Sequence, residues 1–73
     1  MNKYIIPVAD FKAFDVTLYT ITANGYKDCE EKLMKELCEV YEDLPFGIHY
    51  TDFLEECDKL DIIVGEITDI ETI

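Results

Sequence analysis

The alternation of apolar and polar residues near the amino terminus predicts two β-strands joined by a turn. The first apolar run covers residues 4–8. Its Pro7 cannot donate a ladder hydrogen bond, so we expect this position at an edge, at a bulge or facing away from a neighbouring strand. Residues 10–13 are the expected turn, and residues 14–23 form a stronger strand that is rich in Val, Thr, Tyr and Ile.

The apolar positions of this second strand change face near its middle. One face carries Phe14, Val16 and Leu18, and the other carries Tyr19, Ile21 and Ala23. The change of phase between Leu18 and Tyr19 predicts either a bulge or a strand that is covered on both faces, as a second subunit would cover it.

Helical periodicity follows Asn24 and Gly25, either of which is a suitable cap. The spacing predicts a long helix over residues 26–43, with a breaking sequence at Pro45 and Gly47. Thr51 is the expected N-cap of a shorter helix over residues 52–60. The expected inward residues of the two helices are Tyr26, Cys29, Leu33, Leu37, Val40, Tyr41 and Leu44, followed by Phe53, Leu54, Cys57 and Leu60.

The chain closes with a third β-type run over residues 61–73, in which Gly65 is a possible bulge. The predicted order is therefore ββααβ. Three short strands cannot bury a face alone, so the helices must pack on the sheet. We expect one α+β domain over residues 1–73, with two layers, a three-stranded and mainly antiparallel sheet, one long helix and one short helix.

Charge is distributed unevenly along the chain. The 73 residues include 17 Asp or Glu against 6 Lys and no Arg, a net charge of −11, although 49% of them are hydrophobic. Residues 1–27 hold two acids and three lysines, a net of +1, whereas residues 28–73 hold fifteen acids and three lysines, a net of −12. The apolar content excludes a disordered acidic tail, and the charge disfavours direct binding to nucleic acid. A protein partner with a basic surface is expected.

The chain is too short for a deep enzyme cleft, because a domain of this size buries only about 60% of its unfolded surface. No signal peptide or membrane-spanning run is visible in the sequence, so a cytoplasmic protein without membrane contact is expected. Cys29, Cys38 and Cys57 fit neither a disulfide framework nor a metal-ligand pair and are expected as reduced core thiols.

Catalytic and cofactor motifs are weak. His49 could pair with Cys57 only if the loop and the short helix brought them together, and no phosphate-binding glycine motif is present. The carboxylates lack the spacing of a calcium-binding loop, although a Ca²⁺-dependent module stays an alternative. We therefore expect no enzyme activity, no cofactor and no metal site.

The late-helix carboxylates are the candidate functional residues, because anions near a helix C-terminus are disfavoured by roughly 0.3 to 1 kcal/mol each. Stability alone would not select them. The predicted partner-binding surface consists of Glu36, Glu39, Glu42, Asp43, Glu55, Glu56 and Asp58. Tyr41, Phe46, Tyr50 and Phe53 border it as possible aromatic anchors or as core residues.

In its size, its acidic charge and the order of its predicted elements, the chain resembles small acidic proteins encoded by bacteriophages, including anti-CRISPR proteins and other inhibitors of host defence. The resemblance is carried by the short hairpin, the strand-to-helix passage over residues 20–29 and the acidic ending over residues 65–73. It implies an inhibitor, acting as a DNA mimic in the host bacterial cytoplasm, that occupies a nucleic-acid or protein site on a CRISPR or restriction effector.

A second hypothesis is a homo-oligomeric structural or regulatory protein with no nucleic-acid-processing target. In that case a homodimer would bury the second face of the strand over residues 14–23.

Overall fold

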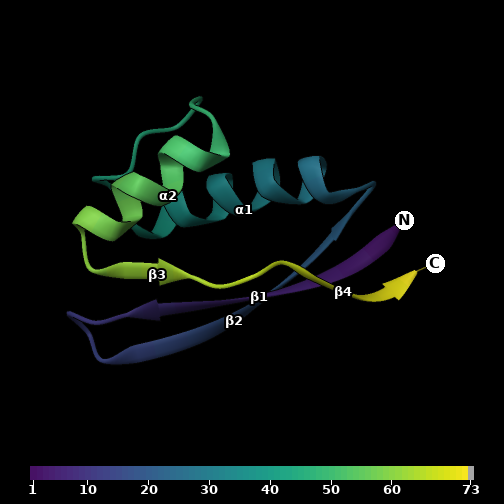
Figure 1. Ribbon diagram of the computed structural model, residues 1–73, viewed down its shortest axis with the longest axis horizontal. Helices are drawn as coiled ribbons and strands as arrows, with labels where there is room; N and C mark the ends of the chain where they lie inside the picture. The colour runs from purple at the N-terminus through teal and green to yellow at the C-terminus, as the bar shows by residue number, and fades with distance from the viewer. Residues whose placement is uncertain (73) are drawn as a thin grey trace.

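A computed structural model describes residues 1–72, which form an antiparallel sheet on one side and two helices on the other (Figure 1). The elements are β1 (Asn2–Asp10), β2 (Asp15–Ala23), α1 (Tyr26–Val40), α2 (Tyr50–Lys59), β3 (Ile62–Val64) and β4 (Thr68–Thr72). The prediction of a two-layer α+β fold with an antiparallel sheet is confirmed. The predicted three-stranded ββααβ arrangement is wrong, because the described residues form four strands in the order ββααββ.

Strand β1 is the centre of the sheet. Its whole length pairs with β2, from Asn2 opposite Ala23 to Asp10 opposite Asp15. On its other side β3 pairs with the end of β1 and β4 pairs with its beginning. The predicted single strand over residues 61–73 is therefore divided into two short strands that follow one another along β1, and Ile73 lies outside the described residues.

The division falls opposite Pro7, which lies in the central strand and not at an edge. The Pro7 carbonyl accepts a hydrogen bond of 2.7 Å from the Gly65 N–H, but proline has no N–H to return. The ladder is interrupted at this point, and residues 65–67 connect β3 to β4. A Cβ atom on Gly65 would lie 2.5 Å from Cγ of Pro7, so the two residues pack at a distance that only glycine allows.

The core lies between the sheet and the helices. Alternate residues of β1 point toward the helices, and one stripe of each helix points back. The most deeply buried large side chains are Tyr4, Ile6, Cys29, Leu33, Leu37, Phe53 and Cys57. Two residues of the predicted stripe, Tyr26 and Val40, are exposed because they are the first and last residues of α1, and Met34 is buried in addition.

The helix boundaries differ from the predicted ones at two places. Gly25 is the N-cap of α1 as expected, but α1 ends at Val40 because Tyr41 has an extended backbone. The second helix begins at Tyr50, one residue before the predicted cap Thr51, and its N-cap is His49. The His49 carbonyl accepts the Phe53 N–H at 2.9 Å, which places Thr51 inside the first turn.

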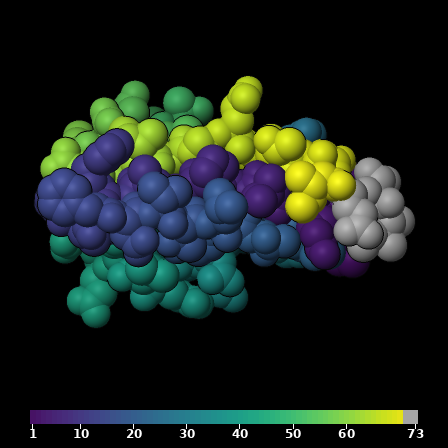
Figure 2. Space-filling model, turned by 90° about the horizontal axis from the view of Figure 1, so that it is seen from below, coloured from purple at the N-terminus to yellow at the C-terminus, as the bar shows by residue number. Residues whose placement is uncertain are grey.

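The face of the sheet that points away from the helices is uncovered. Figure 2 shows this face, with β1 and β2 in front and no helix across it. Val16 and Leu18 are 66% and 62% exposed on it, whereas Ile21 and Ala23 are buried against the helices. The register between β1 and β2 is continuous, so the bulge that the change of phase suggested in β2 is absent from the described strand.

We predict that Gly65→Ala destabilises the fold by about 1–3 kcal/mol, because the added methyl group overlaps the Pro7 ring at a site fixed by the ladder. Gly25→Ala is the control without overlap, since a Cβ there meets no atom within 4 Å, and its expected cost is the smaller one of about 0.5–1 kcal/mol for replacing an N-cap glycine by alanine. Urea unfolding of both variants measures the difference. Equal stability of the two variants would contradict the proposed close packing.

Candidate functional site

The seven predicted acidic residues lie on the helical layer but do not form one continuous surface. Glu36 and Glu39 lie beside β2 in a groove that also contains Lys32 and Lys35. Glu55 and Asp58 lie in a separate groove next to β3. Six of the seven residues are exposed, and the seventh, part-buried Glu56, accepts a hydrogen bond of 2.9 Å from Lys59.

The remaining two residues, Glu42 and Asp43, follow α1 and are not part of it. The last turn of α1 contains no basic residue, so nothing there compensates the negative end of the helix dipole. Ion pairs join Lys32 to Asp28, at 3.3 Å, and Lys59 to Glu56, at 2.9 Å. Within residues 1–72, Glu39, Glu42 and Asp43 form no ion pair.

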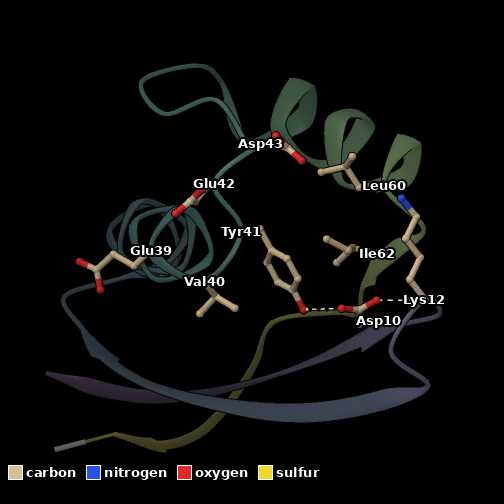
Figure 3. A pocket seen from close by; sticks show the side chains of 9 residues that line it. All are labelled: Asp10, Lys12, Glu39, Val40, Tyr41, Glu42, Asp43, Leu60 and Ile62. Carbon is tan, nitrogen blue, oxygen red and sulfur yellow. Dashed lines mark hydrogen bonds between the residues drawn. The ribbon is translucent and has the colours of Figure 1, made fainter.

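Glu39, Glu42 and Asp43 all line a depression of about 450 Å³, although the Glu39 side chain points away from Tyr41 and Asp10 in Figure 3. It lies between the turn after β1, the end of α1 and the passage from α2 to β3. The lining residues are Asp10, Lys12, Glu39, Val40, Tyr41, Glu42, Asp43, Leu60 and Ile62. Four acidic residues and a single lysine thus line the depression together with three aliphatic residues, of which Leu60 and Ile62 lie on one side of Tyr41 and Val40 on the other (Figure 3).

A hydrogen bond between Tyr41 and Asp10 holds the two sides of the depression together. The Tyr41 hydroxyl donates to Oδ2 of Asp10 at 3.0 Å, as Figure 3 shows. Oδ1 of Asp10 accepts the backbone N–H groups of Lys12 and Ala13 at 3.0 and 3.2 Å. The Ala13 N–H, followed by the Tyr41 hydroxyl, lowers the pKa of Asp10 below its ordinary value. Burial and the bond to Asp10 raise the pKa of Tyr41 to about 12.

The aromatic residues that border the predicted surface have different roles. Tyr41 lines the depression, whereas Phe53 is fully buried in the core and cannot act as a surface anchor. Tyr50 is half-buried, and exposed Phe46 lies with Glu31 and Met34 in another depression.

The sequence did not single out the turn between β1 and β2 as part of the site. Asp10 and Lys12 line the depression, and the neighbouring Phe14 is 92% exposed with a φ of 55°. A positive φ is costly for phenylalanine. An Asp at the start of an expected turn was the available signal, because such residues cap the backbone N–H groups that follow.

The cysteines and the histidine lie apart from the depression. Cys29 and Cys57 are buried in the core, as predicted, and Cys38 is part-buried with its Sγ 3.6 Å from the Leu44 carbonyl. Burial raises the pKa of Cys57 to about 11, which opposes formation of a thiolate, and His49 is exposed. Residues 1–72 contain no group of three or more His, Cys, Asp or Glu placed to hold a metal ion. In the same range, no helix has the length and apolar content needed to cross a membrane.

We predict that Tyr41→Phe raises the pKa of Asp10 only part of the way to 3.8, because the Ala13 and Lys12 N–H groups still bind the carboxylate. The depressed pKa means that Asp10 stabilises the fold above its unfolded pKa, and that this contribution is lost as the pH falls through the folded value. NMR titration of the Asp10 carboxyl carbon measures the shift. An identical pKa in both proteins would show that the Tyr41 bond is not formed in solution.

The comparisons with known proteins leave the depression as the main guide to function. No protein-family model matches the chain, and neither the curated proteins nor the solved structures contain a match. The chemistry of the lining residues therefore has to indicate what the depression binds.

Proposed function

We propose that this chain is a non-enzymatic protein-binding module whose acid-lined depression receives a basic side chain of a protein partner. The observation that carries the proposal is the composition of the depression, which is lined by four acidic residues, one lysine and three aliphatic residues. An arginine or lysine combines a charged head with an aliphatic stem, so it matches both parts of this lining.

The position of the lining residues suggests how such a side chain would bind. Its stem would lie against Leu60 and Ile62 and its charged head near Glu42 and Asp43, while Glu39, whose side chain points outward in Figure 3, would add negative charge at the rim. Asp10 is already engaged by Tyr41 and by two backbone N–H groups, so its main contribution is to hold the hairpin turn against α1. Hydrogen bonds between ionised partners are about twice as strong as neutral ones.

The remaining carboxylates act at longer range in this proposal. Glu36 shares its groove with two lysines, Glu56 is paired with Lys59, and Glu55 and Asp58 lie on the other flank. Together with the site they give residues 28–73 a net charge of −12 from fifteen acids and three lysines. A field of this kind steers association with a cationic surface.

A nucleic-acid-binding protein is the partner class that this charge fits best. Duplex DNA carries one negative charge per about 1.7 Å of its axis, and proteins that bind it offer grooves lined with Lys and Arg. A small acidic module could compete for such a groove. The proposed activity is therefore inhibition of a nucleic-acid-processing complex, of the anti-CRISPR type that the sequence format resembles, in the bacterial cytoplasm.

Displacement of DNA from effector complexes tests this function. Guide-loaded CRISPR effectors and restriction endonucleases would each be loaded with a fluorescent duplex, and release would be followed by anisotropy as the protein is added. We predict release from at least one effector, with an apparent affinity that falls as salt rises. The triple variant Glu39→Lys, Glu42→Lys, Asp43→Lys should bind at least about tenfold more weakly.

The matched control reverses three exposed acids outside the depression, namely Glu31, Glu55 and Glu66, and changes the net charge by the same amount. It should lose less than about threefold, because it removes only screened long-range attraction. An equal loss in both variants would assign the effect to overall charge and not to the depression. If the protein released DNA from none of the effectors tested, this result would contradict the proposed partner class.

A further inference from the structure

The turn that joins β1 to β2 carries two exposed phenylalanines. Phe11 is 57% exposed and Phe14 is 92% exposed, so both side chains lie mostly in solvent. The turn, residues 11–14, lies at one end of the molecule, on the left in Figure 1. Single exposed apolar residues are ordinary on a protein surface, but two phenylalanines in one four-residue turn form an apolar projection. We call residues 11–14 the aromatic tip.

The backbone of Phe14 is unfavourable for its residue type. Its φ of 55° lies in the left-handed region, which glycine and asparagine adopt readily and phenylalanine does not. Asp61 also has a positive φ, but its short polar side chain suits this conformation. Phe14 therefore combines a costly backbone with a side chain that gains almost no burial. Folding of the isolated chain does not account for a phenylalanine at this position.

Hydrogen bonds hold the aromatic tip in one conformation. The Phe11 N–H donates to the Asp61 carbonyl at 3.0 Å, which ties the tip to the passage from α2 to β3. At the base of the tip, the Asp10 carboxylate accepts the two backbone N–H groups that follow Phe11 and the hydroxyl of Tyr41. A contact surface that is already ordered loses little conformational entropy when a partner binds it.

The aromatic tip adjoins the acid-lined depression. Asp10 and Lys12 line the depression, and Phe11 lies between them in the chain. The residues that flank the tip, Asp10 and Asp15, are both acidic and are register partners. A molecule that contacts the tip therefore meets an acidic border, which a basic border on that molecule would complement.

We infer that the aromatic tip inserts into an apolar site on the same protein partner, beside the basic side chain that the depression receives. The inference rests on the proposed function and deepens it, because the partner surface must then combine Lys or Arg with neighbouring apolar side chains. Phenylalanine suits this role, since aromatic side chains bury a large apolar area and are enriched at protein interfaces. Burial of the tip would also explain why Phe14 is placed in solvent despite its backbone conformation.

Two fluorescent arginine-rich peptides of equal length and charge test the inference, one with leucine and the other with serine between the arginines. Binding is followed by anisotropy at about 0.15 M salt. The wild-type chain should bind the leucine peptide at least about tenfold more tightly than the serine peptide, because only leucine offers apolar area to the tip. Phe14→Asn should reduce this ratio to below about threefold and leave the affinity for the serine peptide unchanged.

The stability of Phe14→Asn is the second readout. Asparagine tolerates a positive φ, so the Tm of this variant should rise by at least about 2 °C. A fall in Tm would show that Phe14 is required for folding, and it would overturn the inference.

Phe46→Asn and Leu18→Asn are the matched controls, because these side chains are 65% and 62% exposed and lie outside the aromatic tip. Both variants should keep the tenfold preference for the leucine peptide. Loss of the preference in a folded Leu18→Asn variant, with the preference kept in Phe14→Asn, would move the apolar contact to the sheet and overturn the inference.

The remaining outcomes separate this inference from the proposed function. Equal wild-type affinity for the two peptides would overturn the inference and leave the proposed function in place, since the serine peptide still binds through its arginines. Binding of neither peptide would contradict both. Co-sedimentation of the wild-type chain with phosphatidylcholine vesicles, lost in Phe14→Asn, would assign the tip to a membrane surface and overturn the inference.

Discussion

The fold depends on how the central strand accommodates a proline. Pro7 has a carbonyl but no N–H for pairing with the neighbouring strand. Gly65 lies opposite it: the Gly65 N–H donates to the Pro7 carbonyl, and the absence of a side chain on Gly65 leaves room for the proline ring. Because the ladder cannot continue past this point, the C-terminal edge is divided into β3 and β4. Strand β1 can then pair along both sides and direct Tyr4, Ile6 and Val8 into the core.

This arrangement gives the molecule two surfaces of different chemistry. The sheet comes mostly from residues 1–27, which are nearly neutral, and the acids of its central hairpin, Asp10 and Asp15, are paired on the helix side. The helical layer carries most of the acids, and few of them are paired within the described residues. Most of the charge is thereby separated from the exposed apolar residues Val16, Leu18 and Ile63, and the helical layer is the surface that attracts cations.

Local pattern predicted the elements better than their assembly. The stripe through Cys29, Leu33 and Leu37 was sufficient to find α1, and the β-branched runs located the strands. The division of the last strand was not predictable locally, because it depends on Pro7 more than fifty residues away. Local pattern also does not show how the helices pack, so the sequence alone led us to assign all seven acidic residues to one surface. Only tertiary contact brings Asp10 to Tyr41, and only the separate packing of α1 over β2 and α2 over β3 puts Glu36 and Asp58 on opposite flanks.

The central claim, that the depression binds a basic side chain of a partner, can be tested by following the backbone amide signals of a labelled wild-type sample by NMR. An arginine-rich peptide should shift the signals of Glu39, Tyr41 and Glu42, which line the depression. The signals of Val16, Leu18 and Ile63, on the face of the sheet away from the helices, should stay in place. Shifts that are absent from the depression, or that are as large on the far face of the sheet, would contradict the account.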